Sequence, residues 1–239
     1  MRKAKVERKT NETAVTVELN IDGKGSASIR TPIGFLSHML EAFAKFGLFD
    51  ISVIAAGDLQ VDQHHTIEDI GFVLGQTFSK ALGNRKGINR AGYFILPMDE
   101  SLCIAAADIN GRPYLQYKAS FRRRYCGGFD TDTLEDFFYG FGIGCAANIV
   151  ICTPYGRSDH HKTEAIFKAF GKAMKMACSI DPRASEEIPS TKGVIEMLCG
   201  SFAGKKISRK KMEADDDSNS GLWRWKPVQP SKCDGLPEG

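Results

Sequence analysis

The chain has 239 residues, of which 42% are hydrophobic and 26% charged, values that are ordinary for a globular protein of one domain or two small halves. A net charge of +3 is too small to indicate nucleic acid as a partner, and no apolar run reaches the length of a membrane-spanning helix. The charged N-terminus lacks the apolar segment of a secretory signal, and the seven cysteines include no CxxC pair, so we expect a reduced, cytoplasmic protein.

The first half of the chain predicts two strands, a helix, a third strand and a second helix. The apolar residues of the second helix recur at spacings of three and four, and Asp62 or Gln63 stands at its start as a cap. The elements are expected over 5–9 and 13–21 (strands that pair), 34–47 (helix), 49–61 (strand) and 67–82 (helix).

The second half repeats this order. Ser158 or Asp159 stands at the start of its last helix, as the short polar residues do in the first half. The elements are expected over 101–109 and 113–121 (strands that pair), 133–146 (helix), 148–156 (strand) and 163–177 (helix).

The fold class predicted from this order is α+β, with two similar ββαβα-type halves from an internal duplication and sheets backed by helices. There is room for one more strand in each half. The turn-rich stretch GNRKGINRAG separates the first half, 1–88, from the second half, 89–203. From residue 204 the composition changes to basic, acidic and then Gly- and Pro-rich runs, so 204–239 is predicted to be a disordered tail.

A short pattern of two histidines and a glutamate occurs in both halves. DQHHTIED covers 62–69 and SDHHKTEA covers 158–165, so four of the five histidines stand in two copies that are 96 residues apart. One such pattern alone is more typical of a solvated helix start. Two copies in register, which hold nearly all the histidine of the chain, favour a metal site instead.

The spacing within each copy indicates how metal ions would be shared. His65 and Glu68, at i and i+3, are expected on one face of the helix, whereas His64 points about 100° away. Each copy then offers two ligands to one ion and one histidine to another, which predicts a binuclear site. Imidazole with carboxylate and no thiolate suits Mn²⁺, Fe²⁺, Co²⁺ or Zn²⁺. The fifth histidine, His38, is a further candidate ligand.

Several basic and hydroxyl side chains are candidates for binding a phosphate or a carboxylate. Arg90, Arg112 and Lys192 lie in turn-rich contexts, and the hydroxyls of Ser190 and Thr191 precede the lysine. Each of these residues alone is more typical of a plain surface position. Lys168 is a stronger candidate, because it lies on the second HHxxE helix two turns after His161.

Taken together, these stretches resemble the imidazoleglycerol-phosphate dehydratase family over nearly all of residues 5–198. The order of the motifs and the numbers of residues between them also fit. The motifs are ERKTNET, GFLSHML, GDLQVDQHHTIEDIG, LGNRKGINRAG, LPMDE, NGRPYL, GRSDHHKTEAIFKAFGKAM and PSTKG. The resemblance implies a carbon–oxygen hydro-lyase of L-histidine biosynthesis that acts on imidazole-glycerol phosphate. It also implies a homo-oligomeric shell of 24 subunits, with active sites between subunits and two Mn²⁺ ions in each site.

The resemblance also implies roles for individual residues. One ion would take His38, His65, Glu68 and His160. The other ion would take His64, His161, Glu164 and the residue at position 136. The residues expected to take part in catalysis are Glu12, His64, His65, Glu68, His160, His161 and Glu164. Those expected to contact the substrate are Glu12, His38, His64, His65, Glu68, Arg90, Arg112, Lys168, Ser190, Thr191 and Lys192.

Three positions depart from the usual pattern of the family. Ser37 stands where Asp is common and Phe46 where His is common, and both are neighbours of expected ligands. Asp136 stands where many members carry a ligand histidine, so the second ion would have a changed ligand. An aspartate in the first turn of a helix is also favoured by the helix dipole without any metal.

The residues are also compatible with other functions. A binuclear metallohydrolase acting on a phosphate ester would use the same metals and basic residues. A metal-binding shell or an RNA-binding module of similar topology is a non-enzymatic alternative. The RNA-binding alternative lacks a basic stripe with interleaved aromatic residues.

Overall fold

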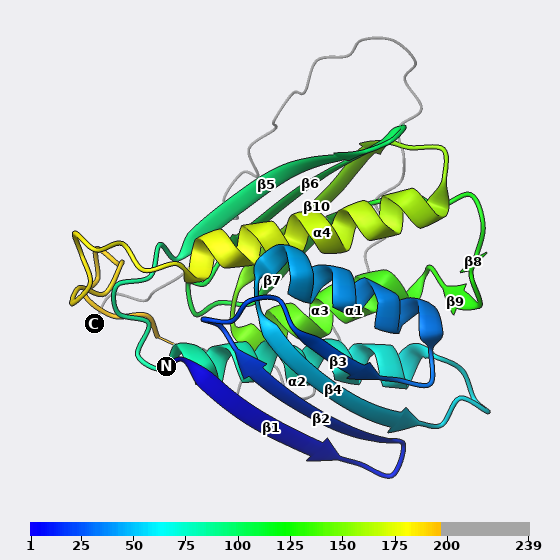
Figure 1. Cartoon of the computed structure of the whole chain (residues 1–239), viewed down its shortest axis with the longest axis horizontal. Coiled ribbons are helices and arrows are strands. Elements are labelled where there is room, and N and C mark those ends of the chain that lie inside the picture. The colour runs from blue at the N-terminus through cyan, green and yellow to red at the C-terminus, as the bar shows by residue number, and fades with distance from the viewer. Residues whose placement is uncertain (197–239) are drawn as a thin grey trace, which may run out of the picture. The chain divides into compact units, whose positions relative to one another are not determined.

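The computed structural model describes residues 1–196, which form two four-stranded sheets with four helices between them (Figure 1). The strands of the first sheet are β1 (Lys3–Lys9), β2 (Thr13–Asn20), β3 (Ala27–Arg30) and β4 (Asp50–Gly57). Those of the second are β5 (Ala91–Met98), β6 (Ser101–Asp108), β7 (Tyr114–Lys118) and β10 (Asn148–Tyr155). The helices are α1 (Gly34–Gly47), α2 (His64–Leu82), α3 (Thr133–Cys145) and α4 (Asp159–Cys178), and a small hairpin joins β8 (Tyr125–Cys126) to β9 (Phe129–Asp130).

The two sheets have the same topology, which confirms the predicted duplication. The strand order is β1-β2-β4-β3 in the first sheet and β5-β6-β10-β7 in the second. In each sheet, the first three strands of that order pair in an antiparallel way. The last strand of the order, β3 or β7, is parallel to its neighbour. Each half is therefore the expected ββαβα unit with one more strand before its first helix.

The predicted pairing of the strands at 101–109 and 113–121 is wrong. β6 pairs with β5 and with β10, whereas β7 pairs only with β10, in parallel. The partner of β6 that the sequence prediction lacked is β5, and β3, β8 and β9 were also not predicted. The β5 run AGYFILPM adjoins the turn-rich stretch between the halves, contains a proline and has no clear alternation of polar and apolar residues. A tight turn then returns the chain into β6, and Asp99 in that turn has a positive φ of 48°.

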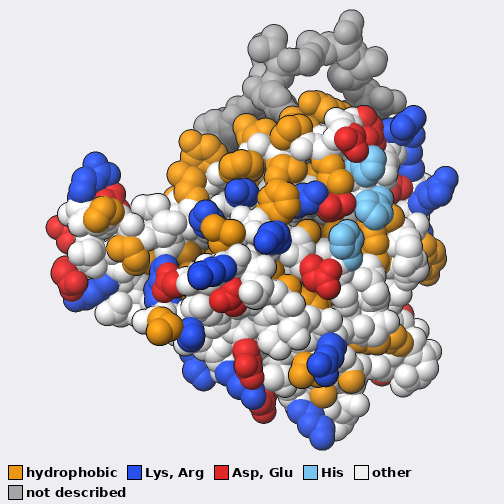
Figure 2. All heavy atoms as spheres, in the orientation of Figure 1, with side chains coloured by type: hydrophobic (Ala, Val, Ile, Leu, Met, Phe, Trp, Pro, Cys, Tyr) orange, Lys and Arg blue, Asp and Glu red, His pale blue; other side chains and the backbone are white. Residues whose placement is uncertain are grey.

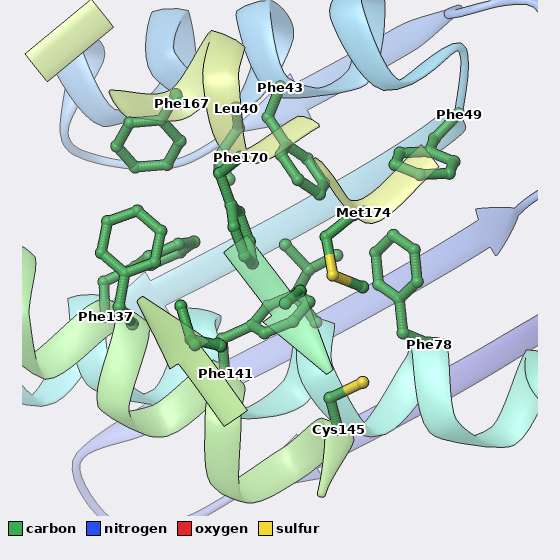
Figure 3. Close-up of a cluster of buried hydrophobic side chains, with 14 of the residues drawn as sticks. Leu40, Phe43, Phe49, Phe78, Phe137, Phe141, Cys145, Phe167, Phe170 and Met174 are labelled. Atoms are coloured by element: carbon green, nitrogen blue, oxygen red, sulfur yellow. The ribbon is translucent and has the colours of Figure 1, made fainter. Parts of the chain in front are cut away.

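The helices carry the core, and each of the two halves contributes to it. Helix α1 packs on α4, and α2 packs on α3, so the contact between the halves is made by helices (Figure 1). Aromatic rings from all four helices fill the interior (Figure 3). The ring of Phe43 stacks on that of Phe170 at 5.5 Å between centroids, and Phe170 meets Phe141 edge-on at 5.0 Å.

Glycines allow α2 and α3 to approach closely. A Cβ atom added to Gly71 would lie 2.2 Å from the carbonyl oxygen of Phe137, and one added to Gly144 would lie 2.2 Å from that of Phe72. Both distances are shorter than any real contact, so a side chain at either position would force the helices apart. This close packing fixes the start of α2 relative to the start of α3.

The boundaries of the proposed halves, 1–88 and 89–203, remain predictions. The segment between them joins the end of α2 to the start of β5. Residues 197–203 and the tail predicted over 204–239 lie outside the described residues.

Candidate active site

The starts of the four helices gather at one end of the molecule, and the HHxxE pairs lie there. All four helices run in the same general direction between the sheets (Figure 1). Figure 2 shows histidine side chains grouped with acidic side chains near the starts of α1 and α4. The second pair is held by a helix cap, because the hydroxyl of Ser158 accepts a hydrogen bond from the backbone N–H of His161.

The first group of possible metal ligands joins α1 to α4. His38, His160 and Glu164 each offer one ligand atom, and these atoms all lie within 4.8 Å of one another. The two histidines are exposed, whereas the Glu164 side chain is only 12% exposed. Burial works to raise the pKa of Glu164, but the hydrogen bond and charge of Lys168 outweigh it, so the pKa lies below its usual value. Glu164 is therefore an ionised ligand candidate.

A histidine with a carboxylate beside each ring nitrogen joins α2 to α3. His64 Nε2 lies 3.6 Å from Glu68 Oε2, and His64 Nδ1 lies 3.1 Å from Asp136 Oδ2. Burial raises the pKa of Glu68, with the Asp136 charge adding to the rise and the His64 ring opposing it.

The other histidine of each pair has its own carboxylates. His65 Nδ1 lies 3.1 Å from Asp58 Oδ2 and 3.9 Å from Glu12 Oε2, and the hydrogen bond with Asp58 raises the pKa of His65. His161 Nδ1 lies 2.8 Å from Glu100 Oε2, and this hydrogen bond lowers the pKa of Glu100 to about 2.

Within one chain, the glutamate of each HHxxE pattern lies beside a different histidine from the one that the sequence spacing suggested. Glu68 was expected to share an ion with His65 at i+3, but within one chain its carboxylate lies beside His64, at i+4. Likewise Glu164 lies beside His160. In both copies the first histidine thus accompanies the glutamate on the helix face. The ligand sets themselves stay predictions, because a second chain would add further residues to each group.

Most of the candidate phosphate-binding residues lie at the other end of α4. The backbone N–H of Arg90 donates to Ala177 O at 2.9 Å, close to the last residue of the helix. The Arg90 guanidinium also donates to Pro189 O at 2.9 Å, which fastens it to the segment that contains Ser190, Thr191 and Lys192. A Cβ atom added to Gly111, the neighbour of Arg112, would lie 2.1 Å from Glu196 O, so this segment reaches Arg112 as well.

Arg90 and Lys168 already have partners within the chain. Arg90 forms a two-point ion pair with Asp108, at 2.7 and 3.0 Å. The ammonium of Lys168 lies 2.7 Å from Glu164 Oε1 and 5.0 Å from the centre of the Phe46 ring. We call the start of α4, with His160 and His161, its histidine end, and the opposite end, beside Arg90 and the 190–192 segment, its basic end. Lys168 therefore belongs to the histidine end.

The two ends of α4 are far apart. His160 and Ala177 are separated by about 25 Å along the axis, from a rise of 1.5 Å per residue. A small molecule bound to the histidine end of one chain therefore cannot reach the basic end of that same chain.

Sequence reasoning did not single out Asp58 and Glu100, the carboxylates hydrogen-bonded to His65 and His161. They lie in loops and turns next to the histidine pairs, where no helical spacing connects them to the ligands. The only signal was their place within the motifs GDLQVDQHHTIEDIG and LPMDE.

Comparison with known proteins decides the family. The family model for imidazoleglycerol-phosphate dehydratase matches residues 31–174. Imidazoleglycerol-phosphate dehydratases from Koribacter versatilis and Caldanaerobacter subterraneus are 50% and 52% identical to the chain over 195 residues. That alignment covers 82% of this chain and the whole of each relative. The chain belongs to the imidazoleglycerol-phosphate dehydratase family.

Solved structures agree with this family membership. A structure of IGPD from Pyrococcus furiosus in complex with (S)-C348 has a TM-score of 0.69 and 33% identity, and covers 79% of this chain and 99% of its own. Imidazoleglycerol-phosphate dehydratase from Staphylococcus aureus has a TM-score of 0.68 and 34% identity, and covers 75% of this chain and 99% of its own.

As a member of the imidazoleglycerol-phosphate dehydratase family, the chain is a hydro-lyase of histidine biosynthesis, as the motifs predicted. A hydro-lyase differs in class from the phosphate-ester hydrolase and the RNA-binding module that the residues also allowed. Within residues 1–196, none of the helices combines the length and apolarity needed to cross a membrane.

Proposed function

We propose that the chain dehydrates imidazole-glycerol phosphate to imidazole-acetol phosphate, with two Mn²⁺ ions in sites built from more than one copy of the chain. The sharing of a site between chains is supported by the distance of about 25 Å between the two ends of α4. The histidine end and the basic end of one chain are too far apart to hold the same substrate, so a complete site needs the basic end of another chain. The proposal includes the 24-subunit shell implied by the resemblance and a cytoplasmic location.

The donor atoms are suited to Mn²⁺. His38, His160 and Glu164 present imidazole nitrogens and a carboxylate oxygen within 4.8 Å of one another. His64 has the same two kinds of donor beside it, with Glu68 near its Nε2 and Asp136 near its Nδ1. When bound, the two cations would act as Lewis acids that lower the pKa of the imidazole ring of the substrate. The residues of the chain would hold these cations in a fixed geometry and orient the substrate.

The remaining chemistry is proton transfer and positioning. The substrate loses the hydroxyl at C3 together with the proton at C2, and the resulting enol becomes the ketone when C3 gains a proton. Glu12 is an exposed carboxylate whose Oε2 lies 3.9 Å from His65 Nδ1. It is therefore placed to carry a proton beside the histidines that would bind the cations. Arg90, Arg112, Ser190 and Lys192 would hold the phosphate and thereby fix the C2–C3 bond for elimination.

The reaction is tested by supplying imidazole-glycerol phosphate and Mn²⁺ to the purified chain. Formation of a ketone without release of inorganic phosphate is expected. Release of phosphate instead would support a hydrolase and contradict the proposal.

The sharing of sites between chains is tested, at a substrate concentration well below KM, with two variants that are each impaired for a different reason. Glu164→Gln alters the histidine end of α4, and Lys192→Ala alters the basic end. When the two variants are unfolded and refolded together, some sites receive unaltered residues from both chains, so activity should rise well above that of either variant refolded alone. No gain on mixing would mean that each site is built within one chain.

A further inference from the structure

The tight turn between β5 and β6 places a carboxylate against the second HHxxE helix at two points. Glu100 Oε1 accepts a hydrogen bond from the backbone N–H of Ser158 at 2.6 Å, and Glu100 Oε2 lies 2.8 Å from His161 Nδ1. Asp99 adopts the left-handed region that this two-residue turn requires, with φ of 48°. The turn therefore aims Glu100 at the residue that caps α4 and at one of its histidines.

We propose that Glu100 is a positioning residue for His161, which holds the imidazole so that Nε2 faces outward as a metal ligand. A carboxylate can only accept a hydrogen bond, so the bond to Nδ1 requires the proton on Nδ1 and leaves the lone pair on Nε2. A carboxylate in this role fixes both the tautomer and the orientation of a ligand histidine. This inference rests on the proposed function, in which His161 binds one of the two ions.

The duplication of the chain explains why Glu100 is needed. Glu12 and Glu100 occupy equivalent places, because each directly precedes the second strand of its half. In the first half, Asp58 already orients His65 at 3.1 Å, and Glu12 lies further away at 3.9 Å. The turn carboxylate of the first half is thereby left free for proton transfer.

The second half has no counterpart of Asp58. The loop that joins β10 to α4 is Gly156, Arg157 and Ser158, whereas the longer loop from β4 to α2 contains Asp58. Asp159, the first residue of α4, is held by Lys162 at 2.8 Å and by the backbone N–H groups of the 122–123 loop. Among the described residues, Glu100 is thus the carboxylate placed to orient His161. The two equivalent glutamates have separate tasks.

The test is the variant Glu100→Gln, measured by Mn²⁺ titration and elemental analysis. Glutamine has the same length, but it cannot serve both partners. With its oxygen on Ser158 N–H, its amide donates to His161 Nδ1, which moves the ring proton to Nε2 and blocks metal binding there. One of the two ions per chain should be bound about 10- to 100-fold more weakly, the range found when the partner of a ligand histidine is lost. The other ion should be unaffected.

A matched control is Asp99→Asn in the same turn. Asp99 Oδ2 lies 3.6 Å from His161 and is mostly exposed, and asparagine tolerates a positive φ. This variant also removes one negative charge but should leave both affinities near those of the parent. Equal weakening by the two variants would mean that only charge matters and would overturn the role of Glu100.

Two further measurements separate the role of Glu100 from folding and from the proposed function. Glu100→Asp retains the charge but is one methylene shorter, so it should recover part of the lost affinity and serves if the glutamine variant fails to fold. A Glu100→Gln protein that binds both ions as tightly as the parent overturns the positioning role alone. A parent chain that binds fewer than two ions overturns the proposed function itself.

Discussion

The Nδ1 atom of His64, in the first turn of α2, lies 3.1 Å from the Oδ2 atom of Asp136, in the first turn of α3. The Asp136 side chain is only 19% exposed, so it points at the histidine rather than into solvent. This contact favours Asp136 as a metal ligand, since a carboxylate binds Mn²⁺ through oxygen as imidazole does through nitrogen.

Asp136→Ala is expected to weaken one of the two metal sites and to reduce activity, whereas Asp136→His should keep much of both. If Asp136 served only the helix dipole, worth about 0.3–1 kcal/mol, none of these changes would alter the metal content. The measurement is the number of ions bound per chain, with Asp136→Asn as the variant that retains size but not charge. Two ions bound as tightly in Asp136→Ala as in the parent would remove Asp136 from the ligands.

Metal removal is expected to abolish activity, and added Mn²⁺ to restore it, because neither the imidazoles nor the carboxylates of the site can replace the charge of the two cations. Activity and metal content are measured on the same samples after chelation and dialysis, and again after Mn²⁺ is returned. Full activity in a sample that elemental analysis shows to be free of metal would contradict this expectation.

Lys192→Ala is expected to weaken substrate binding while leaving the metal content unchanged, because Lys192 belongs to the basic end and not to the histidine end. A charge-assisted hydrogen bond contributes roughly 1.5–3 kcal/mol. The loss in kcat/KM should therefore be about 10- to 150-fold. Steady-state kinetics with imidazole-glycerol phosphate measure it, and an unchanged kcat/KM would argue against a phosphate role for Lys192.

Gly71→Ala is expected to destabilise the chain, because the added methyl group meets the backbone oxygen of Phe137 at 2.2 Å, where no flexible side chain can yield. Overpacking of this kind costs about 1–3 kcal/mol. Gly34→Ala is the matched control, since a Cβ at Gly34, the first residue of α1, meets nothing within 4 Å. Thermal unfolding of the two variants measures the difference, and equal stabilities would mean that α2 and α3 can separate without cost.

The sequence predicted the elements whose signal is local. The bounds predicted for α1, 34–47, match the observed helix, because its apolar spacing is bounded by glycines that begin and end it. The two HHxxE pairs were found at the starts of α2 and α4, since four histidines in two copies form a local pattern. The β5 strand was missed because its residues carry no alternation, and its pairing with β6 depends on a turn of two residues.

The parts of the site that could not be predicted depend on tertiary contacts. No spacing in the sequence brings His64 to Asp136, because their proximity follows from the glycine-lined packing of α2 on α3. Glu100 was missed for a similar reason, since it reaches α4 from a hairpin turn of the second sheet. In both cases the contact joins elements that are far apart in the chain.

The ring of Phe46, in the last turn of α1, lies beside two lysines of α4. The Lys168 ammonium lies over the Phe46 ring at 5.0 Å, and the Lys172 ammonium lies over it at 5.8 Å. A cation over a ring face gains about 0.5–2 kcal/mol. The ring therefore helps to hold Lys168 beside Glu164, where the sequence predicts a contact with the substrate.

Phe46→Leu keeps the apolar bulk but removes the ring face, so KM should rise by about 2- to 30-fold, with kcat and metal content nearly unchanged. Phe46→Tyr retains the ring face and should behave like the parent. Phe94→Leu is the control. The ring of Phe94 lies 5.9 Å from the Lys172 ammonium, and Phe94 has no such contact with Lys168 among the described residues. An unchanged KM in Phe46→Leu, or an equal rise in Phe94→Leu, would show that the ring of Phe46 does not position Lys168 for the substrate.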